Sequence, residues 1–168
     1  MNNMKKDIRV LLHNIRSAHN VGSIFRTADA VGVSHVYLSG YTPCPLDRFG
    51  RPVKEVAKTA LGAEKVIPWE YYKTSIDLVG RLKREGFRVV GIEQDRRATD
   101  YKSYQAPEKL LVLVGNEVRG LSPALRRTCD VLLEIPMRGG KESLNVSVAF
   151  GIALFRILDK QNSGAWNW

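Results

Sequence analysis

The chain contains few of the residues that build disulfide-rich or metal-binding proteins. Its 168 residues include only two cysteines, Cys44 and Cys129, which excludes a disulfide framework and a cysteine cluster. The three histidines, His13, His19 and His35, do not have the spacing of metal ligands. We therefore expect no metal, and the low cysteine content is typical of a reducing compartment.

Long apolar segments are also missing. The longest, residues 146–155, contains a serine and is far too short to cross a bilayer. Residues 1–7 are polar and do not resemble a signal peptide. We therefore expect no contact with a membrane and a cytoplasmic location.

Several common enzyme signatures do not occur. No G-x-G-x-x-G motif follows a strand-like segment, and neither G-x-x-x-x-G-K-[ST] nor G-x-S-x-G is found. Gly115 and Gly120 have part of a dinucleotide spacing, but Glu117 stands where a pyrophosphate would have to approach. These absences disfavour dinucleotide enzymes, P-loop nucleotide hydrolases and α/β-hydrolases.

The length, hydrophobic content and charge of the chain suit one basic globular domain. A hydrophobic content of 44% can fill one core, so we expect a single domain over residues 1–168, with its core at about 8–158. The 26 lysines and arginines exceed the 17 acidic residues and give a net charge of +9. Residues 1–84 carry most of this excess, with 14 basic and 7 acidic side chains. Such a charge favours a phosphate-rich partner.

Part of the basic excess lies near aromatic residues. Arg48, Arg51 and Lys54 accompany Tyr41 and Phe49 in the sequence, and exposed aromatic rings can stack on RNA bases. The alternative is an ordinary solvated surface with some buried aromatic rings. Composition alone leaves both interpretations open.

Short β-rich segments alternate with segments of helical period. We expect six strands, at residues 8–12, 36–38, 66–69, 88–92, 110–114 and 131–135. We expect helices at residues 20–31, 53–61, 75–85 and 145–158, with Asn20, Ser75 and either Ser143 or Asn145 as N-cap residues. Strands that are apolar on both faces and separated by helices predict an α/β fold, with a mostly parallel sheet covered by helices on both faces.

Three polar segments follow predicted strands, at residues 14–30, 113–122 and 135–149. Ligands bind at the carboxyl ends of strands in open α/β sheets, so these segments are candidate site loops. Each segment also has a simpler interpretation. Arg26 could be an ordinary surface arginine, Glu117 could cap a helix or pair with an arginine, and the third segment could be an ordinary helix start.

Together the three segments resemble the motifs of the SPOUT superfamily, in its SpoU/TrmH branch of RNA ribose 2′-O-methyltransferases. The resemblance extends over residues 8–158, and the motifs occur in the order of the family, each after a predicted strand. The matching residues are Asn20-Val21-Gly22 with Phe25-Arg26-Thr27-Ala28, then Gly115-Asn116-Glu117 with Gly120-Leu121, and finally Ser143-Leu144-Asn145-Val146-Ser147.

The resemblance implies a fold, a cofactor and an assembly. The C-terminal part of the sheet would form a deep trefoil knot, an exception to the usual unknotted topology. S-adenosylmethionine would bind in that knot, and two copies of the chain would form a homodimer whose active sites are completed across the interface. The residues that match the family's cofactor site are Ile92, Gly115, Ile135, Met137, Ser143, Leu144 and Asn145.

The resemblance also assigns catalytic roles, to Asn20, Arg26, Glu117, Ser143 and Asn145. A guanidinium stays protonated and accepts no hydrogen bond, so Arg26 is a poor general base. We expect Arg26 to hold the neighbouring phosphate and to stabilise the developing alkoxide. Asn20 and Glu117 would fix the arginine and the ribose, and Asn145 would order the cofactor loop.

The expected substrate is tRNA or rRNA, with tRNA slightly preferred. No separate RNA-binding domain is expected, so the catalytic domain must bind RNA itself, and binding should weaken as salt rises. The candidate RNA-binding residues are Arg26, Arg48, Arg51, Lys54, Arg138 and Lys141. Two other functions stay open: a non-catalytic RNA-binding or assembly factor that keeps the fold, and a SPOUT enzyme that methylates a base.

Overall fold

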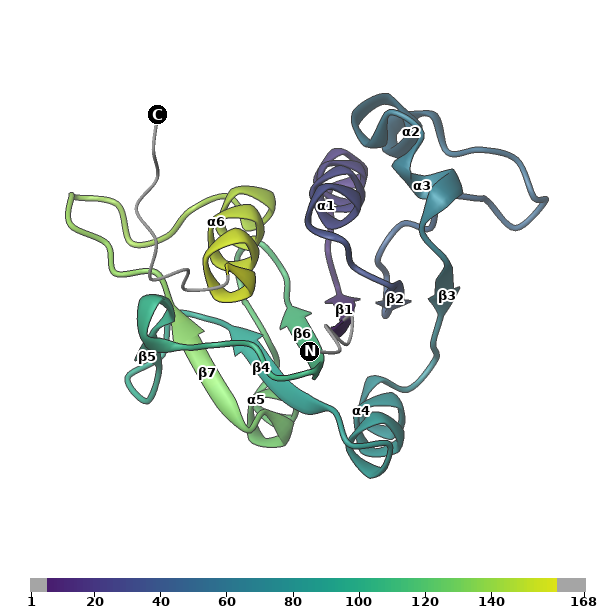
Figure 1. Cartoon of the computed structure of the whole chain (residues 1–168). Helices are drawn as coiled ribbons and strands as arrows, with labels where there is room; N and C mark the ends of the chain where they lie inside the picture. Colours follow the sequence, from purple (N-terminus) through teal and green to yellow (C-terminus); the bar gives the residue numbers. More distant parts are fainter. Residues whose placement is uncertain (1–5, 160–168) are drawn as a thin grey trace, which may run out of the picture.

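The computed structural model describes residues 6–159 and contains a seven-stranded sheet (Figure 1). The strands lie in the order β3-β2-β1-β6-β4-β7-β5, and each neighbouring pair is parallel. The strands are β1 (Asp7–His13), β2 (His35–Ser39), β3 (Trp69–Tyr71), β4 (Arg88–Ile92), β5 (Thr99–Asp100), β6 (Lys109–Val114) and β7 (Val131–Glu134).

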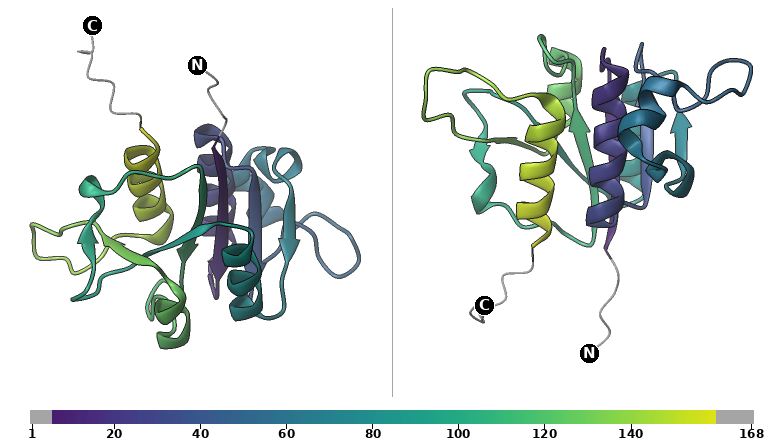
Figure 2. Two further views of the ribbon diagram at one scale, coloured as in Figure 1. Left: turned by 60° about the horizontal axis from the view of Figure 1, so that its bottom comes forward. Right: turned by 90° about the horizontal axis from the view of Figure 1, so that it is seen from above.

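Helices cover both faces of this sheet, as Figure 2 shows. One face carries α1 (Ala18–Val31), α2 (Lys54–Ala60), α3 (Ala63–Val66) and α6 (Val146–Leu158), with α1 and α6 packed side by side. The other carries α4 (Ser75–Arg84) and α5 (Pro123–Thr128). A one-turn 3₁₀ helix, η1 (Tyr101–Ser103), follows β5.

The inner strand β1 shows why both faces need helices. Side chains alternate along a strand, so Val10 and Leu12 pack into the cluster under α1 and α6, whereas Leu11 packs into the cluster under α4 and α5. All three side chains are fully buried. The predicted α/β class, with a parallel sheet between two helical layers, is confirmed.

Some predicted elements differ from the structure. Residue Val66, predicted to begin the third strand, ends the one-turn helix α3, and β3 starts three residues later at Trp69. Strand β5 has only two residues, too few to give a periodic signal. Helix α5 was not predicted, although Ser122 followed by Pro123 is a recognisable helix start, with a capping hydroxyl and proline at the first helical position.

Two predicted caps are also wrong. Helix α1 is capped by Ser17, whose Oγ accepts a hydrogen bond from the Asn20 backbone N–H at 3.2 Å, and Asn20 lies inside the first turn. Thr74 precedes α4, and the Ser75 hydroxyl instead donates to Ser39 Oγ at 3.1 Å. Because Ser17 caps α1, the Asn20 side chain is free to form hydrogen bonds with residues that are distant in the sequence.

The topology brings several loops to one edge of the sheet. Strands β1, β6, β4 and β7 are neighbours and parallel, so the loops after them meet at their carboxyl ends. These loops contain the three polar segments of the sequence. The deep knot in the C-terminal part stays a prediction from the family resemblance.

Candidate functional site

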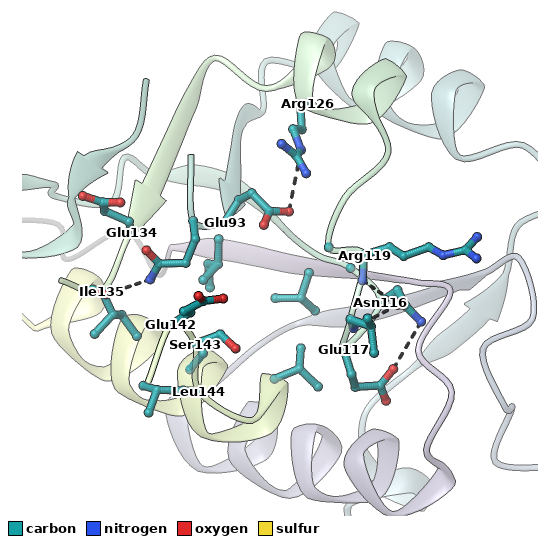
Figure 3. Close-up of a pocket in the computed structure, with 18 residues that line it drawn as sticks. Glu93, Asn116, Glu117, Arg119, Arg126, Glu134, Ile135, Glu142, Ser143 and Leu144 are labelled. Carbon is teal, nitrogen blue, oxygen red and sulfur yellow. Dashed lines mark hydrogen bonds and ion pairs between the residues drawn. The ribbon is translucent and has the colours of Figure 1, made fainter. Parts of the chain in front are cut away.

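A cavity of about 360 Å³ lies at this edge, between the ends of β4, β6 and β7 and the start of α6 (Figure 3). Its wall includes five of the seven expected cofactor residues, namely Ile92, Gly115, Ile135, Ser143 and Leu144. Met137 and Asn145 do not line it. Met137 lies in the loop after β7, and Asn145 is the N-cap of α6, between the lining residues Leu144 and Val146.

The loop after β6 forms a tight wall of the cavity. Asn116 and Gly120 exchange two backbone hydrogen bonds, of 3.2 and 2.8 Å, and the Asn116 Oδ1 accepts the backbone N–H groups of Val118 and Arg119. Gly115 is required here because a Cβ at this position would lie 2.5 Å from the Leu121 backbone nitrogen. The sequence therefore places glycine where two backbone segments touch.

Two residues that the sequence analysis missed hold this loop and the next one in place. Glu93, just after β4, accepts the Leu121 backbone N–H at 2.6 Å and has Arg126 Nε at 3.8 Å. Gln94 donates from Nε2 to the Ile135 carbonyl oxygen at 2.8 Å. Both side chains line the cavity, and they link loops that are distant in the sequence, so no local motif marks them.

Glu117 receives donors from the start of α1. Its carboxylate accepts the backbone N–H groups of Arg16 and Ser17, each at 3.0 Å, and Asn20 Nδ2, also at 3.0 Å. Partial burial opposes the charged form, but these donors together outweigh it and hold the pKa of Glu117 below its ordinary value. Glu117 is therefore an anion fixed in one orientation at neutral pH.

The same network reaches the third motif. Asn145 donates from Nδ2 to Asn20 Oδ1 at 3.1 Å, while its own Oδ1 accepts the Ser147 backbone N–H at 2.9 Å. Asn145 is thus the N-cap of α6, as one of the two predicted alternatives had it. We call Glu117, Asn20 and Asn145 the amide relay, because they join the three sequence motifs by side-chain hydrogen bonds.

Arg26 lies elsewhere within the single chain. It is exposed on α1 and lines a separate hollow with Lys58, Leu61 and Phe155, between α1, α2 and α6. The structure therefore brings together Asn20, Glu117, Ser143 and Asn145 at one edge, and it does not bring Arg26 to the cavity.

The other predicted RNA-binding residues are all on the surface. Arg48 and Arg51 both lie over the exposed Phe49 ring, 4.7 and 4.9 Å from its centroid, and Arg51 also pairs with Asp47 at 2.8 Å. Lys54 is exposed at the start of α2. Arg138 and Lys141 are exposed in the loop between β7 and α6, close in sequence to the cavity wall.

Among residues 6–159, no three or more His, Cys, Asp or Glu side chains are grouped so that they could hold a metal ion. None of the helices in this part of the chain is both long and apolar enough to span a membrane.

Comparison with known proteins gives consistent results. The SpoU rRNA Methylase family matches residues 7–155. A curated relative from Staphylococcus haemolyticus, named a putative TrmH family tRNA/rRNA methyltransferase, is 35% identical over 153 residues, which are 91% of this chain and 59% of the relative. The chain therefore spans about three fifths of the length of that relative.

Solved structures show the same architecture. The AdoMet-bound rRNA methyltransferase from Sinorhizobium meliloti superposes with a TM-score of 0.79 at 30% identity, covering 94% of this chain and 57% of that one. The A. aeolicus TrmH/SpoU tRNA modifying enzyme also has a TM-score of 0.79, at 29% identity, and the match covers 91% of this chain and 74% of that one.

Proposed function

Because the chain belongs to the SpoU rRNA Methylase family, we propose that it transfers a methyl group from S-adenosylmethionine to a ribose 2′-hydroxyl of RNA, with tRNA favoured over rRNA. The observation that carries the proposal is the amide relay. It joins Asn20, Glu117 and Asn145, one from each family motif, beside an open cavity. We also propose that residues 1–168 act as one catalytic domain, with the cytoplasmic location expected from the sequence.

The cavity suits S-adenosylmethionine chemically. Ile92, Ile135 and Leu144 offer aliphatic walls for a flat adenine ring. Four carboxylates and two guanidinium groups line the same cavity, so acidic side chains outnumber basic ones: Glu93, Glu117, Glu134 and Glu142 against Arg119 and Arg126. Such a surface favours a ligand that carries a sulfonium and an ammonium group over an anionic dinucleotide. When bound, S-adenosylmethionine supplies an electrophilic methyl group.

The residues of the chain then have to hold the RNA ribose in line with that methyl group. Glu117 and Asn20 are fixed in orientation by the relay and can position ribose hydroxyls at the cavity mouth. A guanidinium cannot accept the 2′-hydroxyl proton at neutral pH, so we assign that proton to a phosphate or to solvent. Arg26 would stabilise the developing alkoxide.

This role of Arg26 needs a second copy of the chain, because Arg26 does not line the cavity of its own chain. We propose a homodimer that buries the outer face of α6 and brings Arg26 to the partner's site. The supporting observation is an exposed apolar face on α6 beside Arg26, made of Val148, Ile152 and Phe155, of which Phe155 is 57% exposed.

Light scattering tests the assembly. The wild type should have the mass of a dimer, and Phe155→Glu should have the mass of a monomer and lose methyl transfer. Ile76→Glu is the matched control, because Ile76 is a similarly exposed apolar residue on α4, on the other face of the sheet. A monomeric wild type that transfers methyl groups contradicts the shared site.

Nucleoside analysis tests the reaction. The protein is incubated with labelled S-adenosylmethionine and either total tRNA or rRNA, and the RNA is digested and analysed by mass spectrometry. The expected product is a 2′-O-methylated nucleoside, formed in larger amount with tRNA than with rRNA. A methylated base would favour the base-methylating alternative, and RNA binding without any transfer would favour the non-catalytic factor.

A further inference from the structure

A second hollow lies on the other side of the loop that follows β6. It has a volume of about 570 Å³ and is lined by Arg16, Tyr41, Asn116, Val118 and Arg119. Asn116, Val118 and Arg119 also line the first cavity, so the two spaces share one wall. In Figure 3 the Arg119 side chain extends away from Ser143 and Leu144. A group bound in the second hollow is therefore next to the proposed methyl-transfer site.

Tyr41 is held rigidly at this place. Its hydroxyl oxygen accepts a hydrogen bond from Asn116 Nδ2 at 3.0 Å, and its backbone N–H donates to Asn14 Oδ1 at 3.3 Å. Asn116 is only 7% exposed and also donates to the Asn14 carbonyl oxygen at 3.1 Å. Tyr41 itself is 58% exposed. A ring that is fixed at its hydroxyl and exposed to solvent can stack on a base with little loss of conformational entropy.

The charges around Tyr41 are positive and unpaired. Arg16 and Arg119 are both exposed, and neither forms an ion pair with an acidic side chain in the described part of the chain. No carboxylate of residues 6–159 lines the hollow. The nearby Glu117 does not line the hollow, and it accepts hydrogen bonds from the backbone N–H groups of Arg16 and Ser17 and from Asn20, not from the two guanidinium groups. Two free guanidiniums beside an aromatic ring match the phosphates and the base of one nucleotide.

We propose that the second hollow binds one unpaired nucleotide of the substrate RNA, with its base on the Tyr41 ring and its phosphates against Arg16 and Arg119. The inference rests on the proposed function and deepens it, because it adds a substrate class. Bases inside an A-form duplex are stacked on one another and do not offer a free face to Tyr41. The methylated ribose should therefore lie in a loop, a bulge or a single-stranded end.

RNA binding measured by fluorescence anisotropy tests the inference without depending on catalysis. The probes are a labelled single-stranded RNA oligonucleotide and a duplex of the same length, each titrated over a series of KCl concentrations. Tyr41→Leu should weaken binding of the single strand about tenfold and leave the duplex unchanged. Tyr41→Phe keeps the ring and should bind the single strand much more tightly than Tyr41→Leu.

The arginine variants test the phosphate contacts. Arg16→Ala and Arg119→Ala should each lower the slope of log affinity against log salt by about 0.7 for the single strand. Arg84→Ala is the charge-matched control, because Arg84 is exposed at the end of α4, at the amino edge of the sheet. An unchanged melting temperature shows that each variant is folded.

Two results would overturn the inference. One is wild-type affinity and salt slope in Tyr41→Leu, Arg16→Ala and Arg119→Ala. The other is an equal loss of single-strand and duplex binding in Tyr41→Leu. Failure of the proposed function would look different, because the wild type would then transfer no methyl group while these binding differences persisted.

Discussion

The side-chain amide of Asn145 donates a hydrogen bond to the amide oxygen of Asn20 at 3.1 Å, although 125 positions separate the two residues. Asn145 caps α6, and Asn20 lies in the first turn of α1 and donates to Glu117. One hydrogen bond therefore joins the starts of two helices that pack side by side. Changes at either end of the relay should affect both the cofactor loop and the ribose site.

Asn145→Ala should weaken S-adenosylmethionine binding about fivefold, because loss of an N-cap costs about 1 kcal/mol and Ser143 and Leu144 lie directly before the cap. Isothermal titration calorimetry measures the change. Asn145→Ser keeps a capping oxygen but loses the donor to Asn20, so it should retain most of the cofactor affinity and still lower methyl transfer. Equal affinity in Asn145→Ala and the wild type contradicts the role of the cap.

Glu117→Gln should lower the melting temperature at pH 7, because one donor group of the new amide would face the backbone N–H groups of Arg16 and Ser17. The pKa of Glu117 is lower in the folded state than in the unfolded state, where it is near 4.5. The carboxylate therefore stabilises the fold at pH values above the unfolded-state pKa. That contribution disappears as the pH falls through the folded-state pKa. The difference between wild type and variant should therefore shrink below about pH 4.5, and a difference independent of pH would contradict this account.

Gly115→Ala should abolish cofactor binding and destabilise the protein, because the added Cβ would meet the backbone of Gly120 and Leu121. Thermal unfolding and calorimetry with S-adenosylmethionine measure the two effects. Gly139→Ala is the matched control in a neighbouring loop, because nothing lies within 4 Å of a Cβ built there. Similar behaviour of the two variants would refute the close approach of the two backbone segments.

Arg26→Ala should keep S-adenosylmethionine binding and lose methyl transfer about 100-fold or more, the usual cost of removing one donor to a developing oxyanion. Cofactor binding is unaffected because Arg26 lies outside the cavity of its own chain. Arg26→Lys keeps the charge without the two-pronged donor geometry and should recover only part of the rate. Near-wild-type turnover in Arg26→Ala removes Arg26 from the mechanism.

Local sequence patterns predicted most of the fold. Residues 110–114 are a continuous apolar segment, and they form nearly all of the central strand β6. Asparagine is a preferred N-cap residue, and Asn145 is the N-cap of α6. The errors occur where an element is very short or where an apolar residue is exposed. Strand β5 has two residues, and Val66 is apolar but 69% exposed at the end of a one-turn helix.

The site was only partly predictable, for a different physical reason. Motif residues such as Asn20 and Glu117 could be selected from the sequence, but their mutual hydrogen bond depends on tertiary packing. Glu93 belongs to no motif, and the sequence singled out Tyr41 only as one of the aromatic rings near basic residues. Their positions depend on partners 28 and 75 positions away. The spatial separation of Arg26 from the cavity also required the structure, because sequence order places Arg26 only six residues after Asn20.

The pairing of β1 with β6 has a consequence for the order in which the protein is made. Leu12 lies opposite Val114 in the middle of the sheet, so β1 is synthesised about a hundred residues before the strand that pairs with its inner edge. Until β6 has left the ribosome, one edge of β1 has unpaired backbone N–H and C=O groups. Nascent chains that stop before residue 109 should therefore be the form most dependent on chaperones, and folding should be slow because its central contact is so distant in sequence.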